Sequence, residues 1–128
     1  MRLLLDTHAL LWWITDSAKL SARARQSIGT GANVLFWSAA SSWEVGIKYA
    51  LKRLELPAPP EEYLLQHLEM NAVERLDISE RHAYRAAALP RHHADPFDRM
   101  LVAQAQLEGL RVVTADPLLA RYDLKIVW

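Results

Sequence analysis

The sequence contains no cysteine, only four glycines in 128 residues, and no net charge, because 15 Lys and Arg balance 15 Asp and Glu. Without cysteine there is no disulfide, no thiolate zinc site and no cysteine nucleophile, which fits the reducing cytoplasm where we expect the protein to act. No apolar run is long enough to span a bilayer, so we expect no membrane association. The length and the 52% hydrophobic content suit one globular domain over residues 1–128.

Short apolar runs alternate with helical patterns along the whole chain. This alternation predicts an α/β fold, in which a parallel sheet of short strands lies between helices and the crossovers are right-handed. Ligands bind such folds beyond the carboxyl ends of the strands. The patterns place strands at about 2–5, 33–37, 73–78, 111–114 and 125–128, and helices at about 8–14, 21–28, 38–54, 61–70, 79–89 and 95–108.

Two of these helices carry more specific predictions. In the helix over about 38–54, an apolar stripe predicts the buried face. The helix after Ser79 begins Ser-x-x-His, which lacks the Glu or Gln of a full capping box. The residues of the predicted buried stripe are Trp43, Ile47, Ala50, Leu51 and Leu54.

The segment from Asp95 to Asp116 combines a helix and a strand with an acid at each end. Asp95 is placed to cap the helix, Pro96 suits its first position and Asp98 lies in its first turn. Gly109 ends the helix, and a short apolar strand then leads to Asp116. The unit therefore carries Asp98 and Asp116 toward the carboxyl edge of the sheet.

Two further acids reach the same edge. Asp6 directly follows the first strand, and Glu44 lies in the helix that leaves the second strand. Gathered carboxylates repel one another, by roughly 4 kcal/mol for a pair at about 4 Å in an effective dielectric of about 20. Oxygen ligands without thiolates select Mg²⁺ or Mn²⁺, and one or two such ions would activate water for phosphodiester hydrolysis.

Each acid also has a simpler interpretation. Asp95 is explained by helix capping alone, Asp98 by the helix dipole and Glu44 by a surface pair with Lys48. Asp6 is the hardest to explain in this way, because an acid directly after a buried strand lowers stability unless it has a partner. His92 and His93 could ligate a metal, but adjacent loop histidines are more often solvated. If the four acids share one pocket, the rest of the chain has about four more basic than acidic residues, which suits a polyanionic substrate.

Over essentially its whole length the chain resembles the PIN-domain ribonucleases of the VapC toxin type. The resemblance is strongest in the helix motif from Asp95 to Ala105. The motifs that carry it are Leu-Leu-Leu-Asp6-Thr-His, Ser41-Ser-Trp-Glu44, Asp95-Pro-Phe-Asp-Arg-Met-Leu-Val-Ala-Gln-Ala105 and Val113-Thr-Ala-Asp116.

The resemblance implies a three-layer α/β/α sandwich around four to five short parallel strands. It also implies an Mg²⁺- or Mn²⁺-dependent endoribonuclease that forms a homodimer and is inhibited by a cognate antitoxin, whose C-terminal segment occupies a groove near the site. Asp6, Glu44, Asp98 and Asp116 would be the catalytic, metal-binding acids, and Asp95 either a further ligand or only a cap. Thr7 and Thr114 would orient the acids or a metal-bound water. The tryptophans of the first helix and Trp43 could line the antitoxin groove. The proposed RNA contacts are Lys48, Arg91 and Arg99, and Arg99 could alternatively pair with an acid.

Three other functions remain open at this stage. A haloacid-dehalogenase-like phosphatase also has an Asp after its first strand, but it needs a second Asp where this chain has His8. A phospho-acceptor receiver domain needs a lysine at the end of its last strand, whereas Lys125 begins that strand. A non-catalytic binding module with the PIN fold would show no saturable binding of Mn²⁺.

Overall fold

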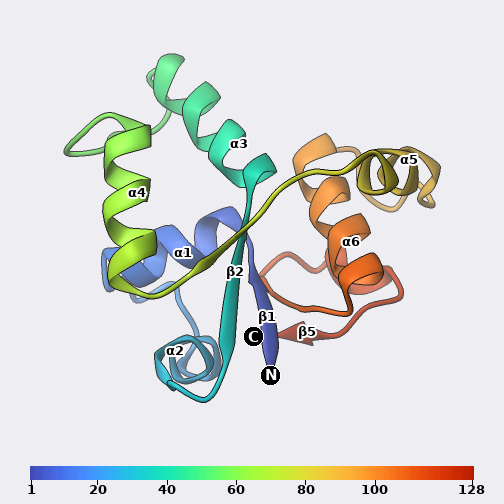
Figure 1. Cartoon of the computed structure of the whole chain (residues 1–128), viewed down its shortest axis with the longest axis horizontal. Coiled ribbons are helices and arrows are strands. Elements are labelled where there is room, and N and C mark those ends of the chain that lie inside the picture. The colour runs from blue at the N-terminus through green and yellow to red at the C-terminus, as the bar shows by residue number, and fades with distance from the viewer.

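The computed structural model describes residues 1–128 and contains a five-stranded, fully parallel sheet of order β3-β2-β1-β4-β5 (Figure 1). β1 occupies the centre, where Leu5 pairs in register with Trp37 on one side and with Val113 on the other. The strands are β1 Arg2–Leu5, β2 Val34–Ser38, β3 Glu74–Leu76, β4 Arg111–Val113 and β5 Ile126–Val127.

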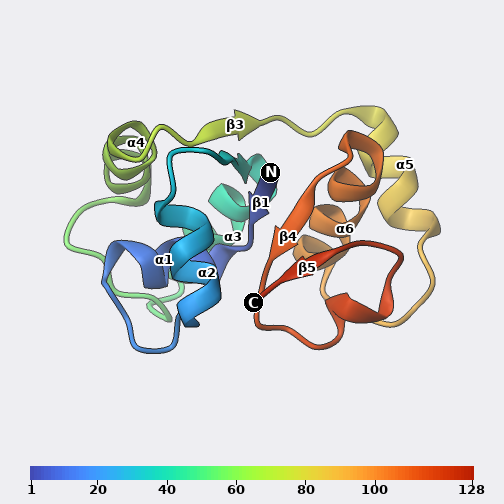
Figure 2. The same ribbon diagram turned by 90° about the horizontal axis from the view of Figure 1, so that it is seen from below.

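Helices cover both faces of the sheet, as Figure 2 shows. On one side lie α1 (Thr7–Ile14), α2 (Ala22–Gly29) and α4 (Pro60–Met70), and on the other lie α5 (Glu80–Ala88) and α6 (Pro96–Glu108). α3 (Ala39–Ala50) follows β2 directly and contacts both α4 and α6. A 3-10 turn, η1 (Leu119–Arg121), precedes β5. The predicted three-layer α/β/α fold is confirmed.

The residues of β1 show why its sequence is apolar throughout. Leu3 and Leu5 join the core cluster formed with α1, α2 and α4, whereas Leu4 packs with Leu101 of α6 on the opposite face. All three β1 leucines are fully buried. A strand covered on both faces has no polar side, so its side chains do not alternate between apolar and polar. None of the helices combines the length and the apolar character that crossing a membrane requires.

The predicted buried face of α3 is wrong, although Leu54, which lies beyond the end of the helix, is partly buried against the core. Trp43, Ile47 and Leu51 are 65%, 37% and 57% exposed, whereas Glu44 and Val45 are buried. α3 follows β2 without a loop, so the strand determines which side of the helix turns inward. The apolar stripe reveals a helical period but not which of two faces meets the sheet.

Smaller differences concern the ends of elements. α3 ends at Ala50 rather than near 54, β3 covers three residues and β5 only two. Contrary to the prediction, the start of α5 does contain a full capping box. The Nδ1 atom of His82 accepts a hydrogen bond from the backbone N–H of Ser79 at 3.0 Å, and the Ser79 hydroxyl accepts one from the backbone N–H of His82 at 3.2 Å. The imidazole ring thus replaces the expected Glu or Gln.

Candidate metal centre

Asp6 lies at the end of the central strand. Its backbone N–H donates to the carbonyl of Val113 at 3.1 Å, which extends the pairing of β1 with β4 by one residue. Its carboxylate accepts the N–H of Ala9 at 2.7 Å and so caps α1. Burial raises the pKa of Asp6, and a hydrogen bond with the Thr114 side chain opposes that rise. The strand end and the helix cap fix this carboxylate at the carboxyl edge of the sheet.

Glu44 approaches from α3 and is also buried. The Thr7 hydroxyl donates to its Oε1 atom at 2.5 Å, and the ammonium of Lys48 lies 2.8 Å from its Oε2 atom. The Glu44–Lys48 pair does exist, but the Glu44 side chain is only 8% exposed, so this is not a solvated surface pair. A buried carboxylate needs such partners, because an unpaired buried charge is strongly destabilising.

Asp98 lies in the first turn of α6. The carboxylate of Asp95 caps this helix by accepting the N–H groups of Phe97 at 2.8 Å and of Asp98 at 3.2 Å. Burial, together with the negative charge of Asp95, raises the pKa of Asp98 to about 7, while His93 lowers it and the Glu44 and Asp6 carboxylates raise it further. The carboxylates of Asp6, directly after β1, and of Glu44 in α3 are therefore near enough to act on Asp98 through their charge.

Asp116 follows β4 and faces Asp98 across a histidine. Its Oδ1 atom accepts the N–H of Leu118 at 2.9 Å, and its own N–H donates to the Thr114 hydroxyl at 3.0 Å. Its Oδ2 atom lies 2.8 Å from the Nε2 atom of His93. Local turn geometry and this one side chain therefore hold the fourth acid in position.

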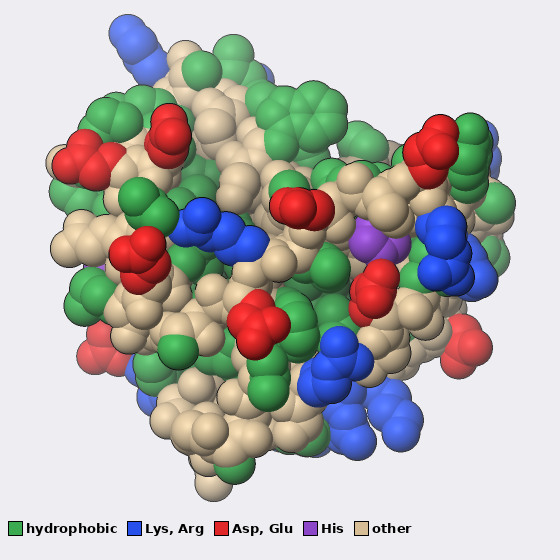
Figure 3. All heavy atoms as spheres, viewed as in Figure 1, with side chains coloured by type: hydrophobic (Ala, Val, Ile, Leu, Met, Phe, Trp, Pro, Cys, Tyr) green, Lys and Arg blue, Asp and Glu red, His purple; other side chains and the backbone are tan.

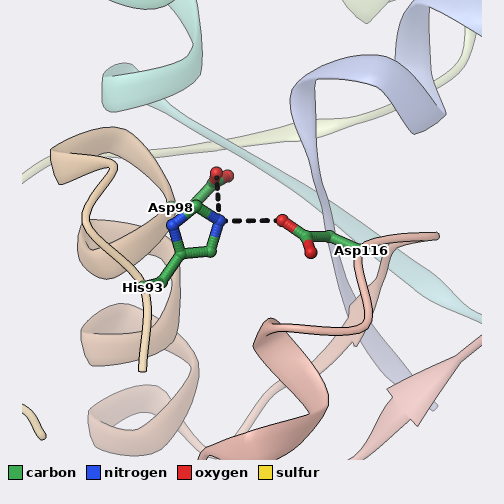
Figure 4. A group of neighbouring side chains, drawn as sticks. All are labelled: His93, Asp98 and Asp116. Atoms are coloured by element: carbon green, nitrogen blue, oxygen red, sulfur yellow. Dashed lines mark hydrogen bonds and ion pairs between the residues drawn. The ribbon is translucent and has the colours of Figure 1, made fainter. Parts of the chain in front are cut away.

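His93 joins Asp98 to Asp116, as Figure 4 shows. Its Nε2 atom is 3.1 Å from the Oδ2 atom of Asp98, and ligand atoms of the three residues lie within 4.8 Å of one another. Its Nδ1 atom accepts the N–H of Asp95 at 3.1 Å. Because Nδ1 must carry the lone pair for that bond, the ring proton is on Nε2, where it points to the two carboxylates.

The sequence prediction treats His92 and His93 alike, but the structure separates them. The exposed His92 stacks edge-on against Tyr122 with ring centroids 5.0 Å apart, whereas His93 contacts two acids. The signal that distinguishes them is the position of His93 two residues before the cap Asp95, which places its ring at the start of α6.

The predicted RNA contacts are placed differently from one another. Arg91 is exposed beside His93, and Lys48 binds Glu44. Arg99 pairs with no acid, and its guanidinium donates to backbone carbonyls around the α5–α6 loop, which favours a structural role over a phosphate contact. These carbonyls belong to Ala86, Ala87, Leu89, Pro90 and His93, at 2.8–3.5 Å.

The donor set fits a hard divalent cation. The four acids come from four elements, and burial, followed by repulsion from the Asp95 carboxylate, raises the pKa of Asp98 to about 7. A divalent cation would relieve that repulsion, and carboxylate oxygens are the ligands that Mg²⁺ and Mn²⁺ prefer. Asp95 uses its carboxylate to cap α6. Thr7 and Thr114 each contact one or more of the four acids.

The chain is similar to known proteins over most of its length. Residues 3–125 match the family model described as PIN domain. Ribonuclease VapC22 of Mycobacterium tuberculosis is 35% identical over 114 residues, which cover 88% of this chain and 85% of that protein.

Solved structures with the same fold have lower sequence identity. VapBC2 from Rickettsia felis, bound to a DNA fragment from its promoter, has a TM-score of 0.68 at 17% identity and covers 98% of this chain and 97% of that one. FitAcB from Neisseria gonorrhoeae has a TM-score of 0.65 at 19% identity, and the match covers 97% of this chain and 95% of that one. A toxin–antitoxin complex from Klebsiella pneumoniae has a TM-score of 0.58 at 21% identity, and the match covers 88% of this chain and 85% of that one.

Proposed function

This chain belongs to the PIN-domain family, and on that premise we propose that it is a metal-dependent endoribonuclease and the toxin of a type II toxin–antitoxin pair. The observation that supports the proposal is the position of Asp98, which His93 joins to Asp116 and whose pKa is raised by the charges of Glu44 and Asp6. A relative at 35% identity is named a ribonuclease, which identifies RNA as the substrate class. We place this activity in the cytoplasm, where RNA and an antitoxin would both be present.

Asp6, Glu44, Asp98 and Asp116 would hold one or two Mg²⁺ or Mn²⁺ ions. Such ions lower the pKa of bound water and neutralise the charge of a phosphodiester. Asp95 contributes negative charge and caps α6 through its Oδ1 atom, while its Oδ2 atom accepts no hydrogen bond.

The other side chains of the site fix the acids. Thr7 and Lys48 each bond one oxygen of Glu44, so this carboxylate is held at both ends. His93 joins Asp98 to Asp116 through its Nε2 proton. Pre-organised acids bind a cation without a further ordering cost, and partners of this kind typically change metal affinity or activity about 10- to 100-fold. Of the three proposed phosphate contacts, Lys48 is bound to Glu44 and Arg99 to backbone carbonyls. Arg91, which is exposed beside His93, is therefore the best candidate.

The antitoxin would occupy a groove between α1 and the segment that follows α3. Trp12 lies in this groove, whereas Trp43 does not. His8, two residues after Asp6, is part of the lining of this groove, so a peptide bound there would lie near this acid. Its lining is His8, Leu11, Trp12, Thr15, Leu54, Glu55, Leu56, Pro57 and Tyr63.

The test is cleavage of RNA by the purified protein with Mg²⁺ or Mn²⁺. Cleavage should disappear with EDTA and in Asp6→Asn, and it should persist in Asp77→Asn, which changes an exposed acid. Equal cleavage by wild type and Asp6→Asn would identify a contaminating nuclease and contradict the proposal. Saturable Mn²⁺ binding without any cleavage would favour a non-catalytic binding module, and release of phosphate from a monoester would favour a phosphatase.

A further inference from the structure

A second cleft adjoins the turn that carries His93. It encloses about 610 Å³, which is within the usual size of sites that hold a small ligand. Its walls come from α5, from the end of α6 and from the segment around η1. The polar residues of its lining are Arg85, His92, Gln106, Arg121, Tyr122 and Asp123.

Positive charge dominates this cleft. Arg85 of α5 and Arg121 of η1 are both exposed, and neither forms an ion pair. Asp123 is the only acid of the lining. The planar guanidinium group matches the geometry of a phosphate, so two unpaired arginines in one cleft favour a phosphate ligand. Figure 3 shows Lys and Arg side chains at the surface in the region where Figure 1 shows α5.

Hydrogen bonds hold Arg85 in position. Its Nη1 atom donates to the Oε1 atom of Gln106 at 3.2 Å, and the Nε2 atom of Gln106 donates to the backbone carbonyl of Asp123 at 3.2 Å. Because Gln106 is neutral, it orients the guanidinium group without cancelling its charge. A side chain that is ordered before binding loses less entropy when the ligand arrives.

Tyr122 connects this cleft to the metal centre. Its ring meets the ring of His92 edge-on, and its hydroxyl accepts the backbone N–H of His93 at 2.9 Å and donates to the carbonyl of Pro90 at 2.9 Å. His92 lines the cleft, whereas the next residue, His93, contacts Asp98 and Asp116. Since consecutive Cα atoms are only about 3.8 Å apart, a strand that crosses this turn can contact both places.

We propose that the cleft formed by Arg85, His92 and Arg121 binds the phosphate backbone of single-stranded RNA, a few nucleotides away from the bond at the metal centre. The two arginines contact phosphates, and the exposed ring of His92 offers a surface on which an unpaired base stacks. The cleft does not touch the reacting phosphate, so it acts on binding and not on the chemical step. The path from this cleft to the metal centre rests on the proposed ribonuclease function, whereas RNA binding in the cleft does not.

Binding of a fluorescent single-stranded RNA, measured by anisotropy in EDTA so that no cleavage occurs, tests the cleft. Arg85→Ala/Arg121→Ala should lower the slope of log affinity against log salt concentration by about 1.4, because each phosphate contact with a single strand contributes about 0.7. Arg85→Lys/Arg121→Lys should keep most of the slope. The control Arg23→Ala/Arg53→Ala removes the same charge from exposed positions outside the cleft and should keep the wild-type slope.

Asp123→Asn should change the affinity in the opposite direction. Removing the one carboxylate of the cleft should strengthen RNA binding, by up to about 5-fold, which is the size expected for one exposed charge pair. The backbone carbonyl that holds Gln106 is retained in this variant. Asp77→Asn, which changes an exposed acid outside the cleft, should bind RNA as the wild type does.

Cleavage kinetics with Mg²⁺ or Mn²⁺ test the path of the strand. Arg85→Ala/Arg121→Ala should raise KM and leave kcat unchanged, because these arginines do not contact the bond that is cleaved. Shortening the RNA on one side of the cleavage site should remove the difference in KM between this variant and the wild type. Shortening it on the other side should preserve that difference.

Equal salt slopes for the wild type and Arg85→Ala/Arg121→Ala would overturn the proposal, and so would an equal loss in Arg23→Ala/Arg53→Ala. Loss of inorganic phosphate binding or of antitoxin binding in the cleft variant, with RNA binding unchanged, would show a different ligand and also overturn it. Identical circular dichroism spectra would establish that the variants fold. Cleft-dependent RNA binding without cleavage by the wild type would contradict only the ribonuclease function, whereas cleavage with an unchanged KM in the cleft variant would contradict only the path.

Discussion

The Nε2 atom of His93 lies 2.8 Å from the Oδ2 atom of Asp116 and donates its proton there, while Asp98 lies 3.1 Å from the same nitrogen. The imidazole ring thereby bridges two acids that would otherwise repel each other. The N–H of Asp95 holds the opposite nitrogen, so the ring could become a metal ligand only by losing the Nε2 proton and breaking that bond. The consequences of this arrangement can be measured.

His93 is therefore expected to orient the acids rather than to bind the ion. Pulsed electron paramagnetic resonance of the Mn²⁺-loaded protein should show no directly bound nitrogen. His93→Ala should weaken Mn²⁺ binding about 10- to 100-fold, because the two carboxylates lose their common donor. His93→Gln, which keeps an N–H donor, should recover part of the loss. A strong nitrogen coupling that disappears in His93→Gln would show direct ligation instead.

Metal binding should depend on pH near neutrality. Because the pKa of Asp98 is raised to about 7, mainly by burial, a proton occupies this carboxyl at lower pH and must leave before an ion binds. The Mn²⁺ affinity, measured by calorimetry, should therefore fall as the pH drops from 8 to about 6. Asp98→Asn should bind more weakly and lose most of this pH dependence, whereas Asp77→Asn should behave as the wild type.

The same carboxyl should affect the stability of the metal-free protein. Its pKa is higher in the folded state, about 7, than the ordinary value of 3.8, so the folded state binds more protons between these values. The free energy of unfolding should then fall as the pH rises from about 4 to about 7, by at most a few kcal/mol from this group. Urea titrations should show this slope in the wild type and a smaller one in Asp98→Asn. An identical slope in both would refute the assignment.

Arg99 should matter for stability more than for RNA binding. Its guanidinium donates hydrogen bonds to five backbone carbonyls. One hydrogen bond to a charged group contributes about 1.5–3 kcal/mol to stability, but the contributions of several bonds made by one group do not add up in full. Arg99→Met should lower the free energy of unfolding by about 2–4 kcal/mol in urea titrations. Arg99→Lys should not restore it, because an ammonium cannot reach the same set of carbonyls. Unchanged stability with weakened RNA binding would instead support a phosphate contact.

Thr7 should act through Glu44. Thr7→Val keeps the side-chain shape but removes the donor to the Oε1 atom, so Glu44 is free to turn and Mn²⁺ affinity should fall about 10-fold. Thr7→Ser, which keeps the hydroxyl, should bind nearly as well as the wild type in the same calorimetric titration. Equal affinity in all three proteins would mean that Lys48 alone orients the carboxylate.

The sequence predicts the parallel α/β fold and the position of each acid within its own element, because both follow from local rules. A fully apolar β1 next to Asp6 indicates a buried strand with an acid at its end, and Asp95-Pro96 marks the start of a helix. These rules place each acid relative to its own element, and the parallel sheet then places the elements relative to one another. No contact between distant side chains is needed for that step.

What the sequence does not predict depends on contacts between elements. The inward face of α3 is set by its direct connection to β2, so the apolar stripe containing Trp43 and Ile47 points outward. The position of His93 two residues before Asp95 is visible in the sequence, but its contacts with Asp98 and Asp116 depend on the turn before α6. The role of Arg99 depends on how the α5–α6 loop returns to the helix. Each case needs a tertiary contact that no periodicity encodes.

The central position of β1 also determines when the site can exist during folding. Leu5 must pair with Val113, so the sheet closes only after segments more than one hundred residues apart have met, and such high contact order slows folding. A partly folded chain can carry Asp6 and Glu44 but not yet Asp98 and Asp116 beside them. The incomplete protein would be chemically inert, so the same step that completes the sheet creates the nuclease.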